Sequence, residues 1–152
     1  MSNLKTFWER FVTENPVYAE HEMPFTDYFC DNKKDADECA DLVVEDIKRA
    51  TTSSVWAIEK FGEKMPAVGD LSIVTNWDGE PKAVIEVTKV EVVKFRDVTA
   101  EYAFTEGEGD KSLQFWRDVH WEFYKREMQP HGEHPTEEMQ VVCEYFTTIW
   151  HG

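Results

Sequence analysis

The sequence predicts an α+β fold in which helices pack at the side of a small, curled β-sheet or barrel. Two patterns support this expectation. Residues 71–77 (LSIVTNW) and 82–95 (KAVIEVTKVEVVKF) are rich in β-branched residues and flank DGEP, a tight hairpin turn. Segments with helical spacing of apolar residues lie both before and after this hairpin. The chain is short and combines helices with a long antiparallel strand pair. This combination indicates a compact α+β domain.

The first part of the chain contains two predicted helices separated by a loop. Apolar residues at three- and four-residue spacing predict a helix over residues 3–13, namely Leu4, Phe7, Trp8 and Phe11. Residues 15–34 carry two Pro and no steady period, so we expect a loop. A capping-box pattern at Asp35 begins the second helix, which is marked by Ala36, Cys39, Ala40, Val43 and Ile47. We expect this helix to end near residues 48–50, which places Lys48 at its negative C-terminal end.

The chain is then predicted to become extended. From Thr51 to about Val55 the residues are β-branched or hydroxylated, which lowers helix propensity. A short helical turn over residues 56–61 and a turn at MPAVGD lead to the hairpin. Alternation in its second strand places Val84 on one face and Ile85 on the other.

The last third predicts a short helix, a long helix and a final strand. Residues 99–106 (TAEYAFTE) form a brief helix capped by Thr99, and EGEGD breaks it. Residues 112–128 form the long helix, and residues 139–150 read as a strand. We expect the following strand residues to be buried: Val84, Ile85, Val87, Val141 and Cys143.

Length, composition and charge limit the kinds of protein that this chain can be. The chain of 152 residues fits a single domain over residues 1–152, with the helix over residues 3–13 as an extension. No apolar run reaches the length of a membrane span, and the N-terminus has no signal-peptide core, so we expect a cytoplasmic protein without a membrane partner. The net charge of −15 argues against tight, nonspecific binding of long DNA or RNA, but allows a small nucleoside or a local basic cleft.

Cysteine and histidine spacing does not indicate a metal site. Cys30, Cys39 and Cys143 are widely spaced and form no CxxC pair, so we expect reduced thiols and no structural zinc. His131 and His134 read as exposed loop residues. His120 lies on the long predicted helix, where packing or hydrogen bonding is a more common role than catalysis.

The stretch KRATTSS, residues 48–54, offers a base beside hydroxyls. A Ser or Thr attacks poorly unless a nearby base takes its proton. Lys48 can serve as that base if burial and the neighbouring Arg49 lower its pKa, whereas a helix C-terminus acts in the opposite direction. On spacing alone, a helix end followed by a strand is the simpler interpretation.

A second candidate is EGEGD, with carboxylates at Glu106, Glu108 and Asp110. Such a run is usually a solvated helix end. One carboxylate turned inward is able to act as a general acid or base, and three are able to hold a hard divalent ion weakly.

Four stretches together resemble the longer bacterial branch of the ASCH domain family. They are KRAT, VGDLSIVTNWDGEPKAVIEVTKVEVVKF, EGEGDKSLQFWRDVHWEFY and EEMQVVCEYF, and they cover the chain from the second helix to the C-terminus. The resemblance implies a fold similar to the PUA domain, a small β-barrel with helices at its side and a cleft between. It also implies action on RNA or on nucleosides.

The resemblance further implies a catalytic set. A shorter member type hydrolyses N4-acetylcytidine to cytidine and acetate with a Lys, a Thr three residues later and a distant Glu. These positions correspond here to Lys48, Thr51 and Glu106. We expect Lys48 to deprotonate Thr51, and Glu106 to protonate the leaving amine. This route needs no metal or cofactor. This chain differs from the shorter type in its N-terminal helix, a larger loop after TTSS and an extra long helix.

The expected substrate-binding residues surround this set. They are Arg49, Thr52, Ser53 and Trp56: Arg49 as part of a basic cleft, backbone N–H groups near Thr52 and Ser53 as an oxyanion site, and a Trp as a stacking surface. We expect Lys48 and Arg49 to line a locally positive cleft.

Two other functions remain open from the sequence. One is a noncatalytic RNA-binding module that uses Lys48 and Arg49. The other is a metal-assisted ribonuclease that uses Glu106, Glu108 or Asp110. The expected partner is therefore a small nucleoside or a short RNA.

Overall fold

The structure is a computed structural model that describes residues 2–152. Its α-helices are α1 (Ser2–Glu14), α2 (Lys33–Val44), α3 (Val55–Lys60), α4 (Ala100–Glu106) and α5 (Leu113–Met128). Its strands are β1 (Phe25–Asp27), β2 (Ala50–Ser54), β3 (Leu71–Thr75), β4 (Pro81–Lys94) and β5 (Gln140–His151). Three short 3-10 helices are η1 (Pro16–Tyr18), η2 (Phe95–Asp97) and η3 (Gln129–His131). The predicted α+β fold is confirmed.

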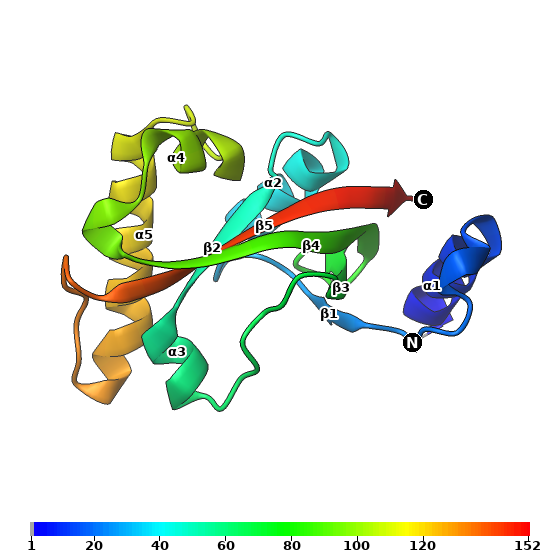
Figure 1. Ribbon diagram of the computed structural model, residues 1–152, viewed down its shortest axis with the longest axis horizontal. Helices are drawn as coiled ribbons and strands as arrows, with labels where there is room; N and C mark the ends of the chain where they lie inside the picture. Colours follow the sequence, from blue (N-terminus) through cyan, green and yellow to red (C-terminus); the bar gives the residue numbers. More distant parts are fainter. Residues whose placement is uncertain (1) are drawn as a thin grey trace.

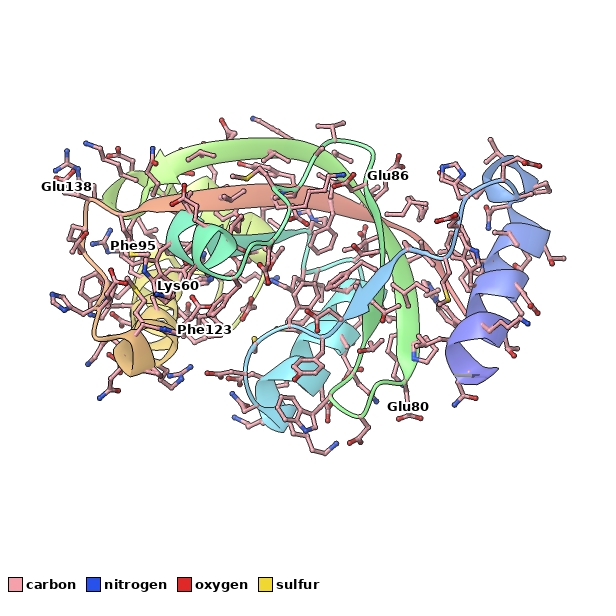
Figure 2. All side chains as sticks on the ribbon, turned by 90° about the horizontal axis from the view of Figure 1, so that it is seen from below. Lys60, Glu80, Glu86, Phe95, Phe123 and Glu138 are labelled. Carbon is pink, nitrogen blue, oxygen red and sulfur yellow. The ribbon has the colours of Figure 1, made fainter. Side chains whose placement is uncertain are left out.

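The five strands form one curled sheet in the order β1-β3-β4-β5-β2. β1 pairs with β3 in parallel, and the other neighbours are antiparallel. In Figure 2, β4 rises from the turn at Glu80 and bends near Glu86. The register between β4 and β5 shifts on either side of this position, after Val84 and after Val87. Such irregularities bend a strand and increase its twist, so they curl the sheet into a half-barrel.

Coverage of both faces of the sheet explains how this part of β4 is buried. Val84 and Ile85 point to opposite faces, and each is at most 3% exposed. One packs under α1 and the other under α2, since the curled sheet is covered on both faces here. The expected burial of the strand residues is confirmed, namely Val84, Ile85, Val87, Val141 and Cys143.

Helices cover the sheet at three places. In Figure 1, α4 and α5 lie at one end of the molecule and α1 at the opposite end. The largest apolar cluster joins α4 and α5 to the sheet and contains Ala50, Phe95, Val98, Tyr102, Ala103, Trp116, Tyr124, Met128, Val141 and Cys143. A second cluster lies under α2. A third joins α1 to β3 and β4 through Phe7, Trp8, Phe11, Ile73 and Val84.

Two expectations about the first part of the chain were wrong. The segment predicted as a loop contains β1, a short edge strand stabilised by pairing with β3. α2 begins after Asn32, whose side chain accepts a hydrogen bond from the Asp35 N–H, and it ends at Val44. Asp46 then adopts a left-handed φ of 61°, and the N–H of Lys48 bonds back to the Leu42 carbonyl. Lys48 therefore lies in the loop beyond the helix, with its N–H bonded to a carbonyl of the last helical turn.

Candidate active site

Lys48 is buried and its ammonium group is fully engaged. The side chain is 1% exposed. Nζ donates to the Ala50 carbonyl at 2.8 Å, to Glu108 Oε2 at 2.8 Å and to Glu106 Oε2 at 3.3 Å. It also lies 5.0 Å from the centre of the Phe29 ring. Three hydrogen bonds use the three donors of an ammonium, so Lys48 is held in one orientation.

Glu106 is the acceptor at the centre of this cluster. It is the last residue of α4, and Gly107 ends the helix with a left-handed φ of 77°. Oε1 accepts from the Thr52 hydroxyl and from Trp116 Nε1, both at 2.7 Å. On Oε2 lie Lys48 Nζ and His120 Nε2. A carboxylate with this many donors is stabilised in its ionised form.

His120 bridges Glu106 and the backbone of α5. Nε2 is 3.1 Å from Glu106 Oε2, and Nδ1 is 2.8 Å from the Trp116 carbonyl. The ring stacks on the Trp116 indole at a centroid distance of 4.2 Å. Both nitrogens face oxygen acceptors, and only the imidazolium has a donor on each nitrogen. The geometry therefore favours a protonated His120.

The electrostatics agree with these contacts. Burial lowers the pKa of Lys48, but the charges of Glu106 and Glu108 outweigh it and raise that pKa above its usual value. Burial raises the pKa of Glu106, but Lys48 and His120 hold it well below its ordinary range. Burial lowers the pKa of His120, and the charge and hydrogen bond of Glu106 raise it by more. The cluster thus balances two cations against two carboxylates.

The four hydroxyls of β2 alternate in direction, as a strand requires. Thr52 Oγ1 lies 3.0 Å from the Tyr102 hydroxyl and donates to Glu106. Ser54, on the same face, caps α3 by accepting from the Ala57 N–H. Thr51 and Ser53 have the opposite orientation, and Ser53 is exposed. The hydroxyl bonded to Glu106 is therefore that of Thr52.

A small pocket opens between α5, β2 and the chain before α2. Its polar lining consists of Lys48, Thr51, Thr52, Glu108 and His120. The remaining lining consists of Phe29, Cys30, Val119 and Phe123. Figure 2 labels Phe123 on α5. Glu106 lies behind this lining and reaches the pocket through its bonds to Lys48, Thr52 and His120.

The backbone of β2 also presents a donor to this pocket. β2 is an edge strand, so alternate residues turn their N–H and C=O groups away from β5. The Arg49 carbonyl accepts from the Phe146 N–H of β5, whereas the Ala50 carbonyl accepts from Lys48. Thr52 shares the orientation of Ala50, so its N–H points away from β5 on the pocket side, whereas the Ser53 N–H points toward β5.

The structure brings together only part of the predicted set. Lys48, Thr51 and Thr52 line the pocket, with Glu106 bonded to two of them. Arg49 is exposed and does not line it. Trp56 does not line the pocket, and its Nε1 donates to Glu133 at 2.8 Å.

The expectation of a positive cleft was wrong, because Glu106 and Glu108 neutralise Lys48 and His120. Lys48 was expected to deprotonate Thr51, but among the described residues it donates no direct hydrogen bond to Thr51, since its three donors are taken by other groups.

Sequence reasoning missed the supporting residues Tyr102, Trp116 and His120. The available signal was the four-residue spacing of Trp116 and His120, which places both on one face of α5.

Among the other candidates, Asp110 accepts from the Ser112 N–H near the start of α5. His131 and His134 are exposed. In the described residues, Cys30, Cys39 and Glu108 form a group with the spacing of metal ligands.

The comparisons decide the family. The sequence profile of the ASCH domain matches residues 25–150. The chain belongs to the ASCH domain family. A crystal structure of an ASCH domain from Lactobacillus crispatus JV V101 is similar with a TM-score of 0.92 and 37% identity, over 99% of this chain and 96% of that one.

Protein EF3133 from Enterococcus faecalis V583 has a TM-score of 0.89 and 28% identity, over 99% of this chain and 90% of that one. No curated protein sequence matches this ASCH domain chain. Within residues 2–152, no helix combines the length and apolarity needed to cross a bilayer.

Proposed function

We propose that this ASCH domain protein is an amidohydrolase that cleaves an acylated nucleoside such as N4-acetylcytidine. The observation that carries the proposal is that Lys48 and Thr51 line one small pocket, with Glu106 bonded to Lys48 directly behind its lining. These residues come from a loop, an edge strand and a helix end. The sequence resemblance assigns them the roles of base, nucleophile and acid.

The proposed roles require a proton transfer within the ion pair, which the raised pKa of Lys48 and the lowered pKa of Glu106 oppose in the resting cluster. In the resting cluster Lys48 carries its proton and Glu106 does not, so Lys48 is not yet a base. Transfer of one proton from Nζ to Glu106 Oε2, across 3.3 Å, converts the pair to a neutral amine and a neutral acid. The amine then takes the Thr51 hydroxyl proton, and Glu106 protonates the leaving amine.

The remaining steps use groups at the same place. Thr51 Oγ1 attacks the acyl carbon, the C–N bond breaks, and an acyl-enzyme ester remains. The outward N–H of Thr52 is suited to stabilise the oxyanion. Water, deprotonated by the Glu106 carboxylate that has given up its proton, attacks the ester and releases the acid. Lys48 returns its proton to Thr51 Oγ1 as the C–O bond breaks.

The pocket also suits an uncharged base. Phe29 and Phe123 supply aromatic surfaces, and stacking on such surfaces contributes about 1–3 kcal/mol per base. The site carries no excess positive charge, and the chain as a whole is strongly acidic. Both features favour a nucleoside over phosphate-rich RNA, so the RNA-binding and ribonuclease alternatives receive less support.

The test is incubation of the pure protein with N4-acetylcytidine and chromatographic detection of cytidine. Wild-type protein should release cytidine, and Lys48→Ala and Thr51→Ala should not. Because these residues act as a unit, the double variant should be little worse than either single variant. Ser53→Ala is the matched control, since Ser53 is an exposed hydroxyl of the same strand. Absence of turnover on a panel of N-acylated nucleosides would refute the proposal.

A further inference from the structure

Two cysteines meet beside the pocket. Cys30 lies before α2 with a left-handed φ of 68°, and Cys39 is 2% exposed within α2. Their sulfur atoms are 3.7 Å apart. The carboxylate of Glu108 completes the group, since one ligand atom from each residue lies within 4.8 Å of the others.

This spacing matches that of metal ligands. Zn–S bonds are about 2.3 Å long, so two thiolates on one tetrahedral Zn²⁺ are separated by roughly 3.8 Å. The two sulfur atoms already have nearly this separation. A carboxylate oxygen binds Zn²⁺ at about 2.0–2.2 Å, which requires only a small movement of the flexible Glu108 side chain.

We propose that Cys30, Cys39 and Glu108 bind one soft divalent cation of the Zn²⁺ class. Thiolate ligands select such ions over Mg²⁺ or Ca²⁺. Three protein ligands leave a fourth tetrahedral position, and Cys30 and Glu108 both line the pocket, so this position faces the pocket. The arrangement is therefore an open site rather than a closed structural one.

The charge balance is compatible with burial. Binding of the dication releases one proton from each thiol, so two protons leave and the total charge of the cluster is unchanged. Lys48 Nζ donates to Glu108 Oε2 at 2.8 Å. This bond leaves the second carboxylate oxygen available to the cation, and Lys48 acts as the group that orients the ligand.

The experiment is a titration of the reduced, chelator-treated full chain with Co²⁺, which replaces Zn²⁺ and reports its ligands. We expect one Co²⁺ per chain, a thiolate-to-cobalt charge-transfer band in the near ultraviolet, and intense visible bands typical of tetrahedral geometry. Addition of Zn²⁺ should displace Co²⁺ and remove these bands. None of these signals depends on hydrolytic activity, so the result is independent of the proposed function.

Variants identify the ligands. Cys30→Ser removes one of the two thiolates and should lower the charge-transfer band by about half or more, and Glu108→Gln should weaken Co²⁺ binding by about tenfold or more. Cys39→Ser also tests the pair, with circular dichroism as a check because Cys39 is in the core. Cys143→Ser is the control, since this buried cysteine lies in a different cluster and should leave the spectrum unchanged. No Co²⁺ binding, binding without the charge-transfer band, or a band of unchanged intensity in Cys30→Ser would overturn the proposal.

Discussion

Lys48 and Glu106 form a buried ion pair across 58 residues of sequence, with Nζ 3.3 Å from Oε2. Neither side chain is more than 3% exposed. Charges in such a position are costly unless each is paired and hydrogen-bonded. Here every donor of the ammonium has an acceptor, and Glu106 has four donors. The pair therefore joins the end of α4 to the loop before β2 in one electrostatic unit behind the pocket.

Removal of Lys48 should destabilise the fold strongly. Lys48→Met leaves Glu106 and Glu108 without their common cation, and we expect a loss of about 3–5 kcal/mol in the free energy of unfolding. The measurement is urea denaturation followed by circular dichroism. Lys48→Met combined with Glu106→Gln should cost less than the sum of the single variants. Strict additivity would show that the two residues do not interact.

The protonation of His120 should make stability depend on pH. Its folded-state pKa is raised above the ordinary value of 6.5, so its contribution to stability is fully present below pH 6.5. That contribution should be lost as pH rises through the folded-state pKa. The difference in unfolding free energy between wild type and His120→Gln should accordingly be larger at pH 6 than at high pH. A pH-independent difference would contradict the imidazolium assignment.

The two neighbouring threonines should differ in their effect on turnover. Thr51→Ala removes the proposed nucleophile and should abolish cytidine release. Thr52→Ala removes one hydrogen bond to Glu106 and should lower kcat only in part, since Trp116, Lys48 and His120 still hold that carboxylate. The measurement is kcat for both variants at saturating N4-acetylcytidine. Full activity in a correctly folded Thr51→Ala protein, with none in Thr52→Ala, would transfer the nucleophile role to Thr52.

The glycine after Glu106 should be essential for the geometry of the cluster. A Cβ at Gly107 would lie 2.5 Å from the Ile47 carbonyl oxygen, in addition to the strain of its left-handed φ. Gly62 has a similar φ of 65° but nothing within 4 Å, so Gly62→Ala isolates the cost of the backbone conformation, about 1–2 kcal/mol.

The loss in unfolding free energy caused by Gly107→Ala should exceed that caused by Gly62→Ala by at least about 1 kcal/mol. The reason is that the backbone of Ile47, which adjoins Lys48, has to move. Thermal and urea denaturation of both variants provide the comparison. Equal losses would show that the close approach to Ile47 carries no penalty.

The sequence by itself determined most of the secondary structure. Period-two apolar residues and a DGEP turn predicted β3 and β4, and the Thr99 cap with the EGEGD break predicted the limits of α4. These signals are local, because capping, turn formation and helix periodicity depend on residues within a few positions of each other. The family resemblance also predicted that Lys48, Thr51 and Glu106 act as a set, which stays a prediction.

Only the tertiary structure decided how the site is arranged. The strand β1 exists because β3 pairs with it, and the early end of α2 depends on a left-handed Asp46 that no periodicity reveals. The inclusion of His120 depends on how α5 packs against β2. The meeting of Cys30 with Glu108 depends on how the chain before α2 lies beside the end of α4. The charge states of the site also depend on the tertiary structure, because the pKa of Lys48 is set by burial and by carboxylates that are distant in sequence and adjacent in space.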